Sequence, residues 1–143
     1  MYIVMLGPPG AGKGTESSRL ALSFGIPHLS TGDILRAAIR DATPLGLQAK
    51  AAVDSGALVD DATINGCVKE RVAKPDAQAG FILDGFPRTI EQAQTLDSIL
   101  KGTGLKVDVA LGPVTRYLKI RPTNRTISEH LELRQCCGRP RCG

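Results

Sequence analysis

Aromatic side chains are scarce in this chain of 143 residues: Phe, Trp and Tyr make up 3% of it, and Trp is absent. Proteins that hold single-stranded nucleic acids commonly stack the bases on clustered aromatic rings, so no such platform is expected. The chain also lacks a continuous apolar run of about 18 residues, the length that a membrane-spanning helix needs. We therefore expect no membrane span. Because strand-like sequence follows Met1 directly, we also expect no signal peptide and a cytoplasmic protein.

Cysteine is also rare, with Cys67 in the middle of the chain and Cys136, Cys137 and Cys142 near its end. A structural zinc site usually takes two pairs of ligands with Cys-x2-Cys or similar spacing. The last three cysteines do not supply two such pairs, which disfavours zinc binding there and leaves the question open. Cys67 is most simply a small buried apolar residue.

The net charge of +4 is unevenly distributed. Residues 1–111 carry 11 Lys and Arg against 12 Asp and Glu, a net charge of −1. Residues 112–143 carry 7 against 2, a net charge of +5. The basic excess thus lies entirely in the last segment, and the larger part of the chain gives no electrostatic reason to expect nucleic acid.

Strand-like and helix-like segments alternate through residue 111, within a length that suits one domain. We expect strands at 2–6, 26–30, 81–84 and 107–111, and helices at 17–24, 34–40, 45–54, 60–72 and 90–101. This alternation predicts an α/β fold with a parallel sheet covered by helices on both faces, and a helical insert at 30–59. From residue 112 the periodicity is poor, so 112–143 is predicted to be an irregular basic tail.

A glycine-rich stretch, GPPGAGKGT at Gly7–Thr15, separates the first strand from the first helix. Glycines let the backbone turn its N–H groups around an anion, the helix N-terminus attracts negative charge, and Lys13 adds a full positive charge. This layout is typical of a phosphate-binding loop, although Gly14 follows Lys13 where the common pattern has a hydroxyl, which comes next at Thr15. A turn without a ligand is the alternative interpretation.

Polar residues follow the ends of two further strands. Because the carboxyl ends of parallel strands meet at one edge of a sheet, Thr31, Asp84 and Arg88 should lie near the glycine-rich loop. Asp84 could then hold Mg²⁺ through water, while Arg36 and Arg88 surround a transferring phosphoryl group with positive charge. The alternatives are helix capping for Asp84 and surface salt bridges for the two arginines.

Four motifs together, GPPGAGKGT, STGDILR (30–36), GALVDD (56–61) and FILDGFPRT (81–89), resemble the successive signatures of the adenylate kinase family, through about residue 111. The resemblance implies a P-loop NTPase-type fold, a monomer, and reversible Mg²⁺-dependent transfer from ATP to AMP that yields two ADP. It implies catalytic roles for Lys13, Asp84 and Arg88, with Mg²⁺ held through water near Asp84 and no direct protein ligand. The implied ATP-binding residues are Gly10, Ala11, Gly12, Lys13, Gly14 and Thr15. The implied AMP-binding residues are Thr31, Arg36, Ala57, Leu58, Val59, Gly85, Phe86, Pro87, Arg88 and Gln92, and 30–59 matches the AMP-binding insert.

The acceptor base is indicated by two residues. Gln92 offers both a hydrogen-bond donor and an acceptor, as the N1 and 6-amino edge of adenine requires. Thr31 is the second such residue: the resemblance is to the adenylate branch of the family, since UMP/CMP kinases usually have Ala at this position. A kinase for another nucleoside monophosphate, such as UMP or CMP, is the alternative.

The family pattern continues with a second mobile lid, a final strand and further helices, and none of their motifs is recognisable after residue 111. Our hypothesis at this point is that 112–143 is a truncated or frame-shifted continuation. The alternative function is then an inactive fragment that at best binds nucleotide.

Overall fold

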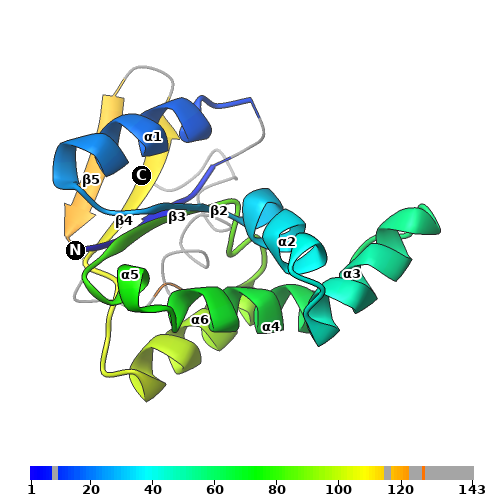
Figure 1. The fold of residues 1–143 in the computed structure, drawn as a ribbon. Coiled ribbons are helices and arrows are strands. Elements are labelled where there is room, and N and C mark those ends of the chain that lie inside the picture. The colour runs from blue at the N-terminus through cyan, green and yellow to red at the C-terminus, as the bar shows by residue number, and fades with distance from the viewer. Residues whose placement is uncertain (8–9, 115–116, 123–126, 128–143) are drawn as a thin grey trace.

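The computed structural model describes residues 1–7, 10–114, 117–122 and 127, which form a five-stranded sheet in the order β2-β3-β1-β4-β5 (Figure 1). The strands are β1 Tyr2–Met5, β2 His28–Ser30, β3 Phe81–Asp84, β4 Val109–Val114 and β5 Tyr117–Pro122. The first four are parallel, and β5 runs antiparallel to β4. The helices are α1 Lys13–Phe24, α2 Thr31–Arg40, α3 Pro44–Asp54, α4 Asp61–Val72, α5 Pro75–Gln78 and α6 Ile90–Gly102.

Helices cover both faces of the sheet, which confirms the predicted α/β fold. Figure 1 shows α1 on one side of the sheet and α4 and α6 on the other. Alternate residues of β1 contribute to two hydrophobic cores. Ile3 and Met5 belong to one core, against which Leu20 of α1 packs. Val4 belongs to the other, which also contains Leu96 of α6. Strands buried on both faces read as continuous apolar runs, and YIVM in β1 is such a run.

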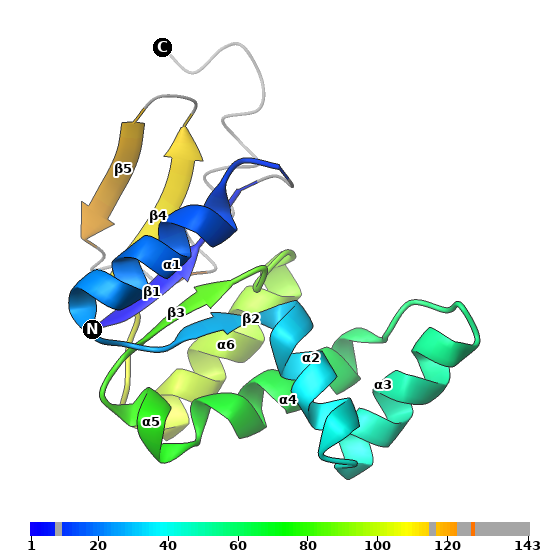
Figure 2. The ribbon, with the colours of Figure 1, turned by 45° about the horizontal axis from the view of Figure 1, so that its top comes forward.

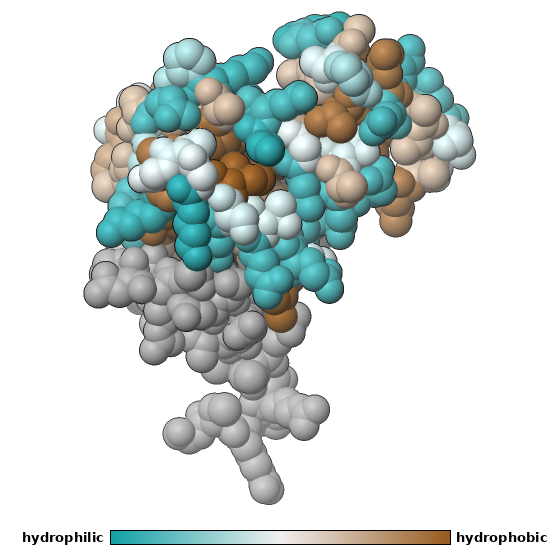
Figure 3. All heavy atoms as spheres, turned by 90° about the horizontal axis from the view of Figure 1, so that it is seen from below, coloured by the Kyte–Doolittle hydropathy of each residue, from teal (hydrophilic) through white to brown (hydrophobic). Residues whose placement is uncertain are grey.

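The two helices predicted within residues 30–59 are present as α2 and α3, and Figure 2 shows α3 projecting away from the sheet. Leu47, Val53 and Leu58, on α3 or just after it, are among the exposed large hydrophobic residues of the described part. Figure 3 shows brown, hydrophobic patches at this end of the molecule. Since α3 packs on α2 and α4, those two helices connect it to the rest of the fold.

The prediction of an irregular segment from residue 112 is wrong for 112–114 and 117–122, which form the end of β4 and β5. Gly112 and Pro113 interrupt the apolar pattern, so periodicity failed to indicate a strand. β4 pairs with β1 only over Val109–Leu111, and beyond that point its register partner is β5. Proline is tolerated where one side of a strand is an edge. The predicted tail beyond residue 127, with Cys136, Cys137 and Cys142, lies outside the described residues.

Cys67 is buried in the core beneath the sheet, as predicted, and burial raises the pKa of its thiol. Among the described residues, no helix has the length and apolar character needed to cross a membrane.

Asp60 should make the stability of the fold depend on acidic pH. It caps α4, and the hydroxyl and N–H of Thr63 donate to its carboxylate at 2.6 and 3.0 Å, which holds its pKa below the ordinary 3.8. A lowered pKa stabilises the fold fully above the unfolded pKa, and the contribution is lost as pH falls through the folded value. We expect the melting temperature of Asp60→Asn, which keeps a capping side chain, to fall less steeply than wild type below about pH 4. Equal slopes in circular-dichroism melts would contradict this role.

Candidate functional site

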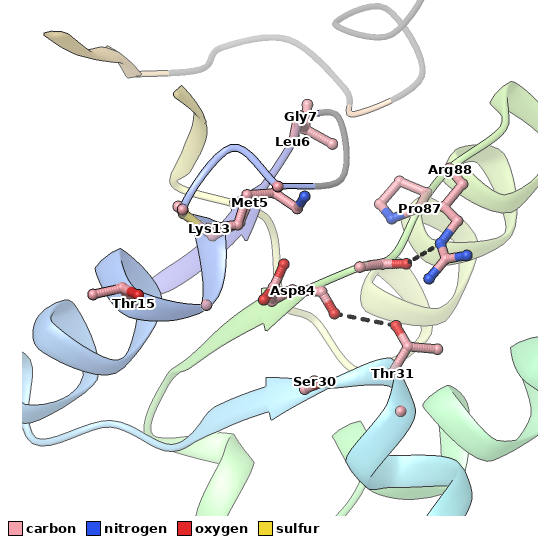
Figure 4. Close-up of a pocket in the computed structure, with 15 residues that line it drawn as sticks. Met5, Leu6, Gly7, Lys13, Thr15, Ser30, Thr31, Asp84, Pro87 and Arg88 are labelled. Carbon is pink, nitrogen blue, oxygen red and sulfur yellow. Dashed lines mark hydrogen bonds between the residues drawn. The ribbon is translucent and has the colours of Figure 1, made fainter. Parts of the chain in front are cut away.

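A cleft of about 770 Å³ opens where β1 and β3 end and α1 and α2 begin (Figure 4). Its lining comes from three segments of the chain that are far apart in sequence: Met5, Leu6, Gly7, Gly10, Gly12, Lys13, Gly14, Thr15, Ser30, Thr31, Gly32, Asp84, Gly85, Pro87 and Arg88. Figure 4 shows Lys13 and Thr15 coming from α1, Thr31 from α2 and Arg88 from the segment after β3. The polar residues predicted at the strand ends therefore meet at one edge of the sheet.

The glycine-rich loop enters α1 through left-handed backbone conformations. Gly10 has φ 77° and Gly12, the N-cap of α1, has φ 76°. A Cβ at either position would have nothing within 4 Å, so glycine is required there by the backbone conformation rather than by lack of space. Among the described residues no side chain caps α1, and the first turn of this helix borders the cleft. An anion at this end would meet backbone N–H groups, the positive end of the helix dipole and Lys13.

Asp84 brings a carboxylate to the middle of this arrangement. It ends β3, between Met5 of β1 and Ser30 of β2, and its Oδ2 lies 3.8 Å from where a Cβ on Gly14 would stand. Carboxylate oxygen suits Mg²⁺, which usually keeps several waters and takes few protein ligands. The described residues hold no cluster of three or more His, Cys, Asp or Glu that could bind a metal ion. The site thus fits an ion that arrives with a phosphate ligand and is held near Asp84 through water.

From the sequence, His28, a neighbour of Asp84, is expected to be a strand residue with a satisfied ring rather than a catalytic base. It does lie in β2, but its buried Nε2 makes no hydrogen bond with the described residues and stands 3.7 Å from Asp84 Oδ2, too far for one. Its place two residues before the end of a strand, on the same side as Ser30, was the signal available in the sequence. His28 belongs to the surroundings of the Asp84 carboxylate.

Thr31 and Arg88 are tied to the segment that follows β3. The Thr31 hydroxyl donates to the carbonyl of Asp84 at 3.1 Å, and Arg88 Nε donates to the carbonyl of Gly85 at 2.9 Å. From the sequence, the hydroxyl and carboxylate of Thr31-Gly32-Asp33 are expected to cap the second helix. This is wrong, since Ser30 is the N-cap and no side chain of the described residues caps the helix. The Thr31 hydroxyl bonds across to the end of β3 instead, which joins the start of α2 to the segment that follows β3.

Several residues implied by the resemblance do not line the cleft. Arg36 pairs with Asp33 at 2.5 Å on the exposed surface of α2, with its guanidinium beside Gly32, which does line it. Ala57 and Leu58 are exposed after α3, and Val59 is half-buried. The remaining three are Ala11, in the glycine-rich loop, and Phe86 and Gln92, which are buried at 1% and 4% exposure.

Comparison with known proteins identifies a protein family that matches this chain. The sequence model described as adenylate kinase matches residues 5–117, past the boundary at 111 that the motifs indicated. An adenylate kinase from Methylobacterium nodulans is 56% identical over 111 residues, which cover 78% of this chain and 56% of the relative. One from Xanthobacter autotrophicus is 51% identical over 132 residues, covering 92% and 67%. One from Clostridium botulinum strain Hall is 55% identical over 111 residues, covering 78% and 51%. The chain therefore spans about half to two thirds of the length of these relatives.

Proposed function

The chain belongs to the adenylate kinase family, and we propose that it acts in the reversible, Mg²⁺-dependent transfer of a phosphoryl group from ATP to AMP, giving two ADP. The observation that carries the proposal is the convergence of Lys13, Asp84 and Arg88 on one cleft. Two positive charges and one carboxylate beside a glycine-rich helix N-terminus fit a reaction that depends on positioning and charge neutralisation rather than on a protein nucleophile.

The donor nucleotide is assigned to the loop Gly10–Thr15. Its backbone N–H groups and the first turn of α1 would hold the phosphates of ATP, with Lys13 on the terminal ones. Bound Mg²⁺ would neutralise phosphate charge, and Asp84 would orient it through water. In the transfer, an oxygen of the AMP phosphate bonds to the γ-phosphorus while the bond from that phosphorus to the β,γ-bridging oxygen breaks, which leaves the electron pair on ADP.

The acceptor is assigned to the other wall of the cleft, formed by Thr31 and the segment Gly85–Arg88, with Gln92 behind it. Arg88 stands where it can neutralise charge on the acceptor phosphate. Arg36 would join it by exchanging Asp33 for phosphate, a small loss because an exposed ion pair contributes little. The backbone of Ala57–Val59 would close over the base. ATP, AMP and ADP are the proposed partners of a cytoplasmic monomer, without nucleic acid or membrane.

Binding and turnover should be measured separately on the 143-residue chain, because the alternative from sequence is a nucleotide-binding fragment without activity. Isothermal titration with ATP and with AMP reports the two subsites, and a coupled assay of ADP formation with ATP, AMP and Mg²⁺ reports transfer. We expect both nucleotides to bind and ADP to form. Binding without turnover would support the fragment, whereas binding of neither nucleotide would refute the proposed function.

The acceptor base is tested by replacing AMP with UMP or CMP in the same titration and assay. We expect the affinity and rate for AMP to exceed those for either pyrimidine nucleotide by about tenfold or more. UMP presents the inverse pattern of donor and acceptor to Gln92, and CMP presents the same pattern at N3 and its 4-amino group but on a smaller ring that does not reach as far. Equal or better use of UMP or CMP would favour the other nucleoside monophosphate kinase.

A further inference from the structure

The side-chain amide of Gln92 is held at both of its ends. The backbone N–H of Arg88 donates to Gln92 Oε1 at 2.8 Å, and Gln92 Nε2 donates to Asp61 Oδ1 at 2.7 Å. Thr89 anchors the backbone of the same residue, because its hydroxyl accepts the Gln92 N–H at 3.2 Å. Only 4% of Gln92 is exposed. Contacts within the protein therefore fix both the position and the rotation of this amide.

The chemistry of the two partners decides which end of the amide is oxygen. A backbone N–H can only donate, and an ionised carboxylate can only accept. A flipped amide would set two donors against each other at Arg88 and two acceptors against each other at Asp61. Each contact alone requires the same assignment of oxygen and nitrogen, so a flip of the amide would break both favourable contacts.

The network leaves a specific hydrogen-bonding capacity unused. A glutamine amide has two N–H groups and two oxygen lone pairs, and each partner takes one. One donor and one acceptor remain, in a known orientation. Adenine accepts at N1 and donates from its 6-amino group, whereas a 6-oxopurine donates at N1 and accepts at O6, which is the inverse pattern. An amide locked one way round can match the first edge and mismatches the second.

We propose that Asp61 is a positioning residue that locks the Gln92 amide and thereby selects adenine over a 6-oxopurine in the acceptor nucleotide. The inference rests on the proposed function, in which Gln92 meets the acceptor base. Asp61 is the first residue of α4 and follows directly on the segment that contains Ala57–Val59. Its carboxylate bridges 31 positions of sequence to α6, so one residue connects the end of the helical insert to the base-reading side chain.

A purely structural bond between α4 and α6 is the competing explanation, and base selectivity separates the two. We would titrate AMP and inosine monophosphate, a 6-oxopurine nucleotide, into the 143-residue chain and its variants. In Asp61→Ala a flip of the amide breaks one favourable contact instead of two. AMP affinity should therefore fall about tenfold while inosine monophosphate affinity stays the same or rises, so that the ratio falls by at least that factor. Asp61→Asn should keep the ratio, because its side-chain oxygen can still accept from Nε2 while Arg88 still requires oxygen at its own end.

Asp60→Ala is the matched control, since it removes the neighbouring carboxylate and the cap of α4 without touching Gln92. It should lower the melting temperature and leave the ratio unchanged. An Asp61→Ala ratio equal to wild type, in protein that binds AMP, would overturn the inference and leave the proposed function intact. Failure of wild type to bind AMP would overturn both.

Nuclear magnetic resonance tests the lock without any nucleotide. In wild type, one Nε2 proton of Gln92 should be shifted downfield by the carboxylate and exchange slowly with solvent. Both properties should be lost in Asp61→Ala and kept in Asp60→Ala. Identical Gln92 side-chain signals in wild type and Asp61→Ala would refute the lock whatever the titrations give.

Discussion

Replacing Lys13 by Ala is expected to reduce ATP affinity by a hundredfold or more, and to abolish detectable ADP formation. Lys13 lies in the first turn of α1 and lines the cleft together with Thr15 and Asp84. Loss of a charged group on a phosphate leaves developing negative charge without its partner, at a cost of about 3 kcal/mol in transition-state stabilisation. The measurements are isothermal titration with ATP and the coupled ADP assay.

Lys106→Ala provides the matched control, because it removes the same charge from an exposed position in the segment before β4. It should bind ATP as wild type does. AMP affinity in Lys13→Ala should change much less than ATP affinity, since the acceptor is assigned to the opposite wall. ATP affinity within twofold of wild type would refute the assignment of the donor phosphates to this loop.

Replacing Gly46 by Ala should cause the largest loss of stability, about 3 kcal/mol or more in the free energy of unfolding. Gly46 is buried in α3, and an added Cβ would lie 2.0 Å from the carbonyl oxygen of Ala38, 2.3 Å from its carbonyl carbon and 2.8 Å from the nitrogen of Ile39. All three atoms belong to the backbone of α2, so no rotamer change relieves the overlap and the helices must separate. Urea unfolding followed by circular dichroism measures the effect.

Gly→Ala substitutions at other helix positions distinguish the effect of steric overlap on stability from the effect of helix propensity. A Cβ on Gly102, at the end of α6, would have nothing within 4 Å, so Gly102→Ala should leave stability unchanged or raise it by up to about 1 kcal/mol. The stability of Gly66→Ala should lie between those of Gly46→Ala and Gly102→Ala. The atom nearest to a Cβ on Gly66, at 2.6 Å, belongs to the flexible side chain of Leu45, which can move. A Gly46→Ala variant as stable as Gly102→Ala would contradict the close approach of α2 and α3.

Much of the fold follows from patterns within short segments. β3 begins and ends where the run FILD does, and Thr89 caps α6 as its position before the helix indicates. β5 escaped prediction because it is stabilised by pairing with β4, whose continuation past Leu111 contains Gly112 and Pro113. α5, a single turn of four residues, is too short to show a helical period. Local rules succeeded where a segment's own residues supply its stabilisation.

The candidate site likewise has features that follow from local sequence and features that depend on how the strands are aligned. The conformation of the stretch from Gly10 to Thr15 follows from its own residues, since Gly10 and Gly12 supply the left-handed turns and a helix N-terminus follows. The rule that parallel strands end at one edge brought Thr31, Asp84 and Arg88 to the same cleft. It could not show that His28 faces Asp84, because that depends on how β2 and β3 are aligned.

The sequence by itself determined the glycine-rich loop, the alternation of strands and helices, and the family motifs, because each depends on residues that are near neighbours in the chain. The tertiary structure alone decided that Asp61 holds Gln92 and that Gly46 lies against the backbone of α2. It also decided that the Thr31 hydroxyl bonds to the carbonyl of Asp84 at the end of β3 instead of capping its helix. These contacts join elements whose relative positions come from packing the whole core, and a hydrogen bond or an overlap depends on differences of less than an ångström that no local pattern encodes.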